Sequence, residues 1–164
     1  MTGRSRWPAP RWEKLWLAEH TNSQCATGQL AEVLDGADVF IGVSAPNLLS
    51  GDELIAMAED PIVFALANPD PEVEPAAARK HAAVVATGRS DQPNQINNLL
   101  VFPGVARGLL DAGVDTLTVE MQLAAAAAIT DQVGETLWAD EVVPSVFDER
   151  LVPAIAAAIR QAAG

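Results

Sequence analysis

Tyrosine is absent from this chain of 164 residues, and its only lysines are Lys14 and Lys80. A tyrosine–lysine pair that exchanges a proton with a substrate is therefore excluded for this chain alone. Cys25 is the only cysteine, which excludes an internal disulfide and any metal centre built from several cysteines. Because such sparse use of cysteine is typical of a reducing compartment, we expect a cytoplasmic location.

Long apolar runs and clusters of basic residues are also missing. No hydrophobic run approaches the roughly 20 residues that a membrane-spanning helix needs. No apolar core follows the arginines near the N-terminus, so we expect no secretory signal. The formal net charge is −12 at pH 7. Nucleic acids and anionic membranes attract clustered Lys and Arg, so we expect neither among the partners.

The remaining composition is typical of a soluble globular protein, with 49% hydrophobic and 20% charged residues. Residues 1–15 are rich in Arg, Pro and Trp, and we expect them to form a loose arm. Within and just after it, Trp12, Leu15 and Trp16 are spaced as one face of a short helix. The domain itself is expected at residues 16–164.

Three short apolar runs predict strands, at residues 38–44, 61–67 and 82–86. The first is apolar on both faces, which is typical of a strand in the middle of a parallel sheet. Helices are predicted around and after the strands, at residues 28–34, 50–60, 74–81, 96–112, 118–133 and 148–162. This alternation predicts an α/β fold with a parallel sheet.

Two of the predicted helices carry particular signals. Ser50 and Glu53 have the spacing of a capping box, with Leu54, Ile55 and Met57 contributing an apolar stripe behind them. In the helix at 96–112, Pro103 predicts a kink.

Three strands are few for a doubly wound sheet, which usually has five or six. The Gly-x-Gly-x-x-Gly loop that holds a dinucleotide pyrophosphate is also absent from the chain. We therefore predict a partial Rossmann-like, doubly wound parallel sheet, equivalent to the second half of a dinucleotide-binding domain, with additional C-terminal helices.

Polar side chains follow the second and third predicted strands. Asn68 comes directly after the second strand, and Asn97 and Asn98 end the long loop after the third. Because parallel strands end at one edge of the sheet, where such folds bind ligands, we expect these amides to lie together. An amide holds a carboxylate or a carboxamide without adding charge, and the following helix directs backbone N–H groups to the same place. The loops after these two strands are therefore the candidate ligand-binding region.

These polar residues also have structural alternatives. An asparagine before proline, such as Asn68, often only forms a turn. Asn97 and Asn98 are suitable caps for the helix that follows them, and Ser44 is a suitable cap for a turn. Capping is compatible with ligand binding, so these alternatives stay open.

Charged residues near the same loops have alternatives too. Arg89 and Asp91 either pair with each other to hold the loop or contact a substrate. We expect Glu72 and Glu74 in the solvated first turn of the helix at 74–81, where acidic residues are favoured, rather than at a metal.

Several segments resemble the malic enzyme family in its shorter bacterial form. They are residues 28–34, 36–44, 61–69, 71–72 and 86–108. The most specific segment is 87–104, which runs from Thr87-Gly88-Arg89-Ser90-Asp91 through Pro93-Asn94-Gln95-Ile96-Asn97-Asn98 to Phe102-Pro103-Gly104. The resemblance extends from about residue 16 to about residue 133. It implies an oxidoreductase that converts malate to pyruvate and carbon dioxide with NAD or NADP and with Mg or Mn.

The resemblance also implies roles for individual residues. Gly42, Val43 and Ser44 are expected beside the nicotinamide nucleotide. Asn68 is expected near both the nicotinamide and malate. Asn97 is expected at the nicotinamide amide and Asn98 at a malate carboxylate.

The family's acid/base tyrosine and lysine, its acidic metal ligands and its Gly-rich loop lie upstream of the matching region and have no counterpart here. We therefore expect no catalytic residue and no metal ligand in this chain, weak NAD(P) binding and no activity of the chain alone. It is expected to be a truncated product, a fragment or one piece of a split enzyme. The alternative is a catalytically dead remnant or interaction module that keeps the scaffold.

The identity of the nucleotide stays open, because the residue that distinguishes NAD from NADP contacts the adenosine ribose in the part that is missing here. The expected partners are malate or pyruvate and a nicotinamide nucleotide in the complete enzyme. The missing N-terminal half, or further copies of this chain, are also expected partners.

Overall fold

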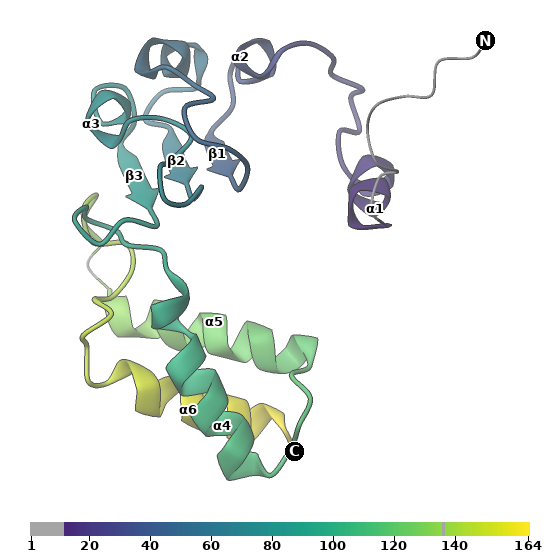
Figure 1. Ribbon diagram of the computed structural model, residues 1–164, viewed down its shortest axis with the longest axis vertical. Coiled ribbons are helices and arrows are strands. Elements are labelled where there is room, and N and C mark those ends of the chain that lie inside the picture. Colours follow the sequence, from purple (N-terminus) through teal and green to yellow (C-terminus); the bar gives the residue numbers. More distant parts are fainter. Residues whose placement is uncertain (1–11, 136) are drawn as a thin grey trace.

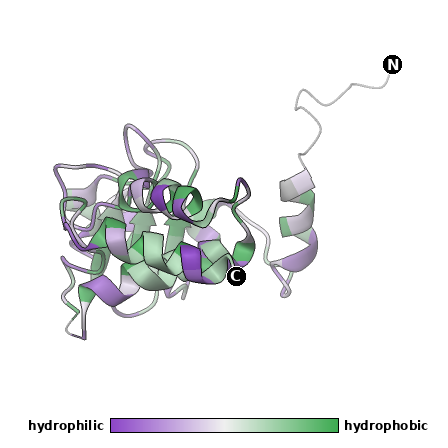
Figure 2. Ribbon diagram, turned by 90° about the horizontal axis from the view of Figure 1, so that it is seen from below, coloured by the Kyte–Doolittle hydropathy of each residue, from purple (hydrophilic) through white to green (hydrophobic). Residues whose placement is uncertain are grey.

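The computed structural model describes residues 12–135 and 137–164, apart from the side chains of residues 13 and 14. Figure 1 shows an α/β part, which holds strands β1 to β3, and a helical part, which holds α4, α5 and α6. The predicted arm at 1–15 lies mostly outside the described residues, and helix α1 (Trp12–His20) begins within it. Figures 1 and 2 both show α1 apart from the two parts, and Trp12 and Trp16 are accordingly exposed.

The α/β part is built on strands β1 (Val39–Gly42), β2 (Ile62–Ala65) and β3 (Val84–Thr87). All are parallel and lie in the order β1-β2-β3, in a register that aligns Gly42, Ala65 and Thr87. The short helices around them are α2 (Leu30–Val33), the 3-10 helix η1 (Gly51–Ala56) and α3 (Pro75–Ala78). The predicted α/β fold with a parallel sheet is confirmed.

The expectation that the first strand lies inside the sheet is wrong. β1 is an edge strand of the described sheet, and its side chains alternate between exposed and buried. Phe40 packs in one core with the buried residues of η1 and α3, whereas Ile41 on the opposite face is 62% exposed. Because these helices pack on the Phe40 side, β1 is left with a bare apolar face, made up of Val39, Ile41 and Val43.

The segment after β1 keeps its predicted cap but forms a tighter helix. The Glu53 carboxylate accepts hydrogen bonds from Ser50 N at 2.7 Å and Ser50 Oγ at 2.8 Å. η1 is a 3-10 helix, with about three residues per turn, so Leu54 and Met57 share the buried face. Ile55 turns toward solvent and is 65% exposed, and the predicted apolar stripe is wrong at this residue.

The helical part contains the 3-10 helix η2 (Asn98–Leu100), then α4 (Phe102–Ala112), α5 (Val119–Val133) and α6 (Leu151–Ala162). The helix predicted at 96–112 is therefore two helices that meet at Val101. Pro103 lies in the first turn of α4, where backbone N–H groups have no partner within the helix, so its missing N–H costs no helical hydrogen bond. The chain therefore breaks at Val101 rather than kinking at Pro103. Within residues 12–135 and 137–164, every helix is too short or too polar to cross a bilayer.

The three long helices enclose a second core, made up of Leu100, Val105, Met121, Ala125, Leu151, Ile155 and Ile159. Gly104 and Gly108 of α4 press against α6. A Cβ at Gly104 would lie 2.5 Å from the Cβ of Ile155, and one at Gly108 would lie 2.6 Å from the Cβ of Ile159. The two helices can approach this closely only because α4 has no side chains at these positions.

Gly104→Ala should destabilise the protein by about 1–3 kcal/mol, because the added methyl overpacks the contact with Ile155. Guanidinium unfolding followed by circular dichroism measures this change. Ala106→Ser, on an exposed position of the same helix, is the control and should stay within about 0.5 kcal/mol of the parent. An unchanged midpoint for Gly104→Ala would contradict the close approach of α4 and α6.

Candidate functional site

A pocket of about 290 Å³ opens beyond the carboxyl ends of β2 and β3. Its lining comes from the loop after β2, the loop after β3 and the start of η2, and consists of Leu66, Asn68, Gly88, Ile96, Asn97 and Asn98. The parallel register brings these loops together, since both strands end at the same edge of the sheet. The structure thus gathers all three sequence-predicted asparagines around one hollow, and none of the lining residues is charged.

Asn97 is half-buried and holds the turn into η2. Its Oδ1 accepts a hydrogen bond from Leu99 N at 3.1 Å, so Asn97 is the N-cap of η2. Its Nδ2 donates to Gly88 O at 3.4 Å. The capping alternative is therefore present in the structure, and one further N–H and one lone pair of this amide remain for a ligand.

Asn68 and Asn98 are exposed at the pocket. Among the hydrogen bonds of the described residues, none uses either side chain. The Asn68–Pro69 peptide is cis. The side-chain amides of Asn68 and Asn98 are thus available to a ligand that enters the pocket.

Gly42, Val43 and Ser44 do not line this pocket. They end β1, two strands away from β3, and the chain continues past them into an exposed loop. Ser44 is engaged in hydrogen bonds to a carboxylate, which makes it a structural residue of that loop. Their predicted contact with a nucleotide stays a prediction.

That carboxylate belongs to Glu72, and its expected place in a solvated helical turn is wrong. Glu72 is fully buried. Its Oε1 accepts from Ser44 N at 2.7 Å and Ser44 Oγ at 3.3 Å, and its Oε2 accepts from Ala67 N at 3.0 Å. α3 begins only at Pro75, with the exposed Glu74 as its N-cap, so Glu72 precedes the helix and turns inward between the ends of β1 and β2.

The sequence signal for this burial is Gly42, which was overlooked. Gly42 leaves room for Glu72, because a Cβ at residue 42 would lie 2.5 Å from the Cδ of Glu72.

The loop after β3 is held by an ion pair. Arg89 Nε and Nη2 donate to the two carboxylate oxygens of Asp91, at 2.8 Å and 2.7 Å. The hydrogen bond and the charge of Arg89 lower the pKa of Asp91 to about 2. Of the two alternatives for these residues, the structure contains the pairing.

Within the described residues, no group of three or more His, Cys, Asp or Glu side chains is arranged to hold a metal ion. The pocket itself offers amides and backbone groups, which suit carboxylate and carboxamide ligands.

Comparison with known proteins agrees with this arrangement. The family model described as "Malic enzyme, NAD binding domain" matches residues 13–163. The chain belongs to this family. It is 48% identical over 155 residues to an NAD-dependent malic enzyme of Geobacillus stearothermophilus, an alignment that covers 94% of this chain and 32% of the relative. It is 49% identical over 149 residues to a bifunctional malic/malolactic enzyme of Bacillus subtilis, covering 90% and 36%. The chain thus spans about a third of the length of these relatives.

Solved structures of malic enzymes have the same fold. The Pyrococcus horikoshii enzyme superposes with a TM-score of 0.83 at 43% identity, over 92% of this chain and 36% of that one. The NAD-dependent enzyme of Thermotoga maritima gives a TM-score of 0.83 at 40% identity, over 89% and 38%. The resemblance inferred from the sequence and the Rossmann-like fold class are therefore confirmed.

Sequence reasoning overlooked Asn94, which joins the two parts of this malic enzyme domain. Its backbone is left-handed, with φ of 54°, and its side chain is buried. Its Nδ2 donates to Val85 O at 3.2 Å and Ala139 O at 2.7 Å, and its Oδ1 accepts from Val142 N at 2.8 Å. Asparagine adopts this backbone conformation more readily than most residues. One side chain thus ties β3 to the segment that leads to α6.

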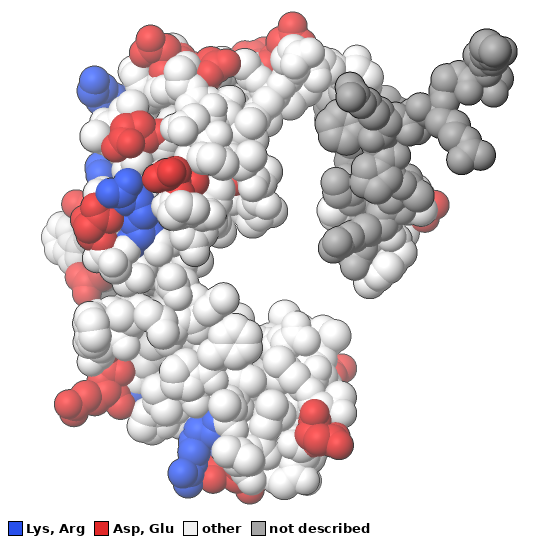
Figure 3. Space-filling view, viewed as in Figure 1, with Lys and Arg blue, Asp and Glu red and all other residues white. Residues whose placement is uncertain are grey.

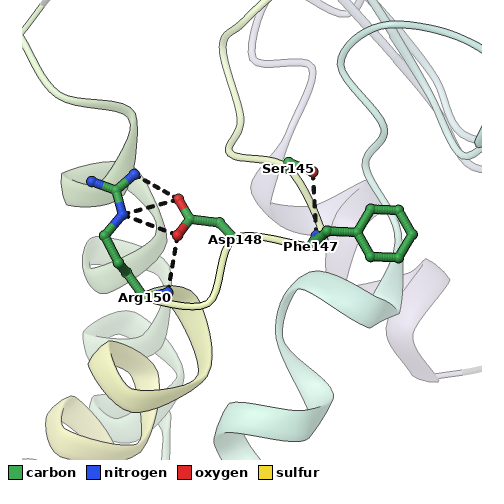
Figure 4. Close-up of polar contacts among 4 residues, drawn as sticks. All are labelled: Ser145, Phe147, Asp148 and Arg150. Atoms are coloured by element: carbon green, nitrogen blue, oxygen red, sulfur yellow. Dashed lines mark hydrogen bonds and ion pairs between the residues drawn. The ribbon is translucent and has the colours of Figure 1, made fainter.

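That segment carries an exposed aromatic side chain, Phe147, which Figure 4 shows beside Ser145 and Asp148. Ser145 Oγ accepts a hydrogen bond from Phe147 N at 3.2 Å, and the carboxylate of Asp148 binds the guanidinium of Arg150. These contacts hold the turn while Phe147 stays 89% exposed. Phe147 also lines a second hollow, between this segment and the loop after β3.

Charge is distributed unevenly around these features. Figure 3 shows acidic and basic side chains in scattered groups on the face in view, with broad uncharged areas between them. The asparagine pocket is likewise lined without charge, although the whole chain carries a net charge of −12. The residues lining the pocket thus offer a ligand side-chain amides and no charged group.

In Arg89→Met, the pKa of Asp91 should rise from about 2 toward its ordinary value of 3.8, because the hydrogen bond and the charge of Arg89 are lost. The pKa is depressed in the folded protein, so the pair's contribution to stability is complete above about pH 4 and is lost as the pH falls to about 2. Carbon-13 NMR titration of the Asp91 carboxyl measures the shift. Asp148, whose pKa is also lowered to about 2 by its own arginine, is the internal control and should not change. An unchanged titration of Asp91 would refute the pairing.

Proposed function

We propose that this chain contributes the nicotinamide- and malate-contacting loops of a malic enzyme, which oxidises malate to pyruvate and carbon dioxide with NAD or NADP. The observation that carries the proposal is the convergence of Asn68, Asn97 and Asn98 on one uncharged pocket in a member of this family. The names of the relatives include NAD-dependent and NADP-dependent enzymes, which supports a nicotinamide nucleotide of either kind.

The chemistry of the pocket suits these ligands. Asn98 and Asn68 each offer two N–H donors to a malate carboxylate, and Asn97 keeps one N–H for the carboxamide of the nicotinamide. The role of this chain is to orient the hydroxy acid beside the nicotinamide ring, so that a hydride leaves the carbon bearing the hydroxyl in a defined direction.

A proton acceptor for the malate hydroxyl is not proposed within this chain, because the sequence has no tyrosine. A bound divalent metal would polarise the carbonyl for decarboxylation, but the described residues have no ligand cluster for it, and no step is assigned to it here. These groups are proposed to come from the part of a malic enzyme that these residues do not contain.

The bare face of β1 is the proposed contact with that part. Val39, Ile41 and Val43 form an exposed apolar row on one face of β1, and an exposed apolar surface of this kind marks a place where another segment packs. The relatives are about three times longer than this chain, which supports a missing segment as the occupant.

Composition favours a second candidate, a non-catalytic remnant or interaction module that keeps the scaffold. Its supporting observation is the lack of tyrosine and the near lack of lysine. The two candidates differ in whether activity can be restored, and the following experiment separates them.

Co-expression with the unmatched part of the Geobacillus stearothermophilus relative should give malate-dependent reduction of NAD or NADP in the presence of magnesium or manganese. Asn98→Ala should then lower kcat/KM for malate by about 10- to 100-fold, as expected for loss of one hydrogen bond to a charged group. Gln122→Ala removes an exposed amide on α5 and is the matched control. A folded complex without activity would favour the non-catalytic candidate, and an active Asn98→Ala complex would rule out its role at malate.

Ile41→Lys should prevent this association, because a charged side chain would be buried against the partner at the β1 face. Analytical ultracentrifugation of the co-expressed pair measures the complex. Leu123→Lys changes an equally exposed leucine on α5 and should leave the complex intact. Association that survives Ile41→Lys would place the contact elsewhere.

A further inference from the structure

Glu72 joins the ends of two strands through a single carboxylate. One oxygen accepts from Ser44 N and Ser44 Oγ beyond β1, and the other accepts from Ala67 N beyond β2. Ala67 directly precedes Asn68, so the hydrogen bond from Ala67 N acts on the backbone one residue before a pocket amide. Glu72 itself does not line the pocket.

This arrangement is specific for a carboxylate. Every contact comes from a donor, and an ionised carboxylate is the side chain that only accepts. Glutamine has the same shape, but its NH₂ group would face the N–H of either Ala67 or Ser44. Two donors would then face each other, and one of the present hydrogen bonds would be lost. Within the described part of the chain, none of the ion pairs includes Glu72.

The neighbouring backbone is shaped around this carboxylate. A Cβ at Gly42 would lie 2.5 Å from Cδ and 2.7 Å from Oε1 of Glu72. Gly42 O in turn accepts from Leu66 N at 3.0 Å. β1, β2 and Glu72 therefore form one connected unit, in which the position of Ala67 depends on where the carboxylate lies.

We propose that Glu72 is a positioning residue: it sets the distance between the Ser44 loop and Ala67, and thereby directs the Asn68 amide into the pocket. The proposal rests on the proposed function, since Asn68 is taken to contact malate and the nicotinamide. A buried carboxylate that only stabilised the fold would affect Asn68 no more than any other residue.

The first test needs no ligand. In nitrogen-15 NMR spectra of the 164-residue chain, Glu72→Gln should move the backbone amide signals of Ser44 and Ala67 and the side-chain NH₂ signals of Asn68. Glu74→Gln, an exposed carboxylate two residues away, is the matched control and should leave all three in place. Unmoved Asn68 signals in a folded Glu72→Gln chain would overturn the proposal.

If Glu72→Gln does not fold, Ser44→Ala is the second variant, because it removes only the 3.3 Å contact between the Ser44 hydroxyl and Glu72. Ser44→Ala should also move the side-chain NH₂ signals of Asn68. Unmoved Asn68 signals in this variant would overturn the proposal equally.

The second test uses the complex that contains the rest of the enzyme. Glu72→Gln should raise KM for malate by about 10-fold, a typical cost of a small misplacement of a binding group, with a smaller change in kcat. Because Glu72 acts through Asn68, Glu72→Gln should add nothing in an Asn68→Ala background. Additive effects would overturn the proposal in favour of general stabilisation. A parent complex without malate-dependent activity would instead overturn the proposed function, while the NMR result would still decide whether Glu72 positions Asn68.

Discussion

Gly42, Ala65 and Thr87 lie side by side at the carboxyl ends of three parallel strands, and this shared register determines where the polar loops of the chain meet. Because the strands run in the same direction, the residues that follow each of them leave the sheet at one edge. Asn68 lies about 30 residues before Asn97 and Asn98 in the sequence, yet all three line one pocket, because β2 and β3 end at the same edge of the sheet. A register shift of one residue would reverse the faces of a strand, separate these loops and bury the wrong side chains.

The sequence predicted the features that depend on local pattern. The three strands and the capping box at Ser50 are set by residues close in the sequence, and both are found in the structure. The segments around Asn68 and Asn98 were also recognised correctly as malic enzyme segments.

The features that sequence reasoning failed to predict depend on contacts between distant segments. The burial of Glu72 depends on the space that Gly42 leaves across the sheet, and neither residue indicates the other in the sequence. The exposure of Ile41 depends on which segments cover that face, while its apolar run is equally typical of a buried strand. Asn94 belongs to a recognised motif, but its hydrogen bonds reach residues 139 and 142, nearly 50 positions away.

The uncharged lining of the asparagine pocket has a consequence for how ligands arrive. The ligands proposed above, malate and a nicotinamide dinucleotide, are anions, whereas the chain has a net charge of −12 and the residues lining the pocket include no cation. At low ionic strength, long-range repulsion opposes this encounter. Salt screens that repulsion over about 10 Å at 0.1 M, while the short-range amide contacts remain. Moderate ionic strength should therefore favour the proposed binding, the reverse of its usual effect on a site that attracts anions with lysine or arginine.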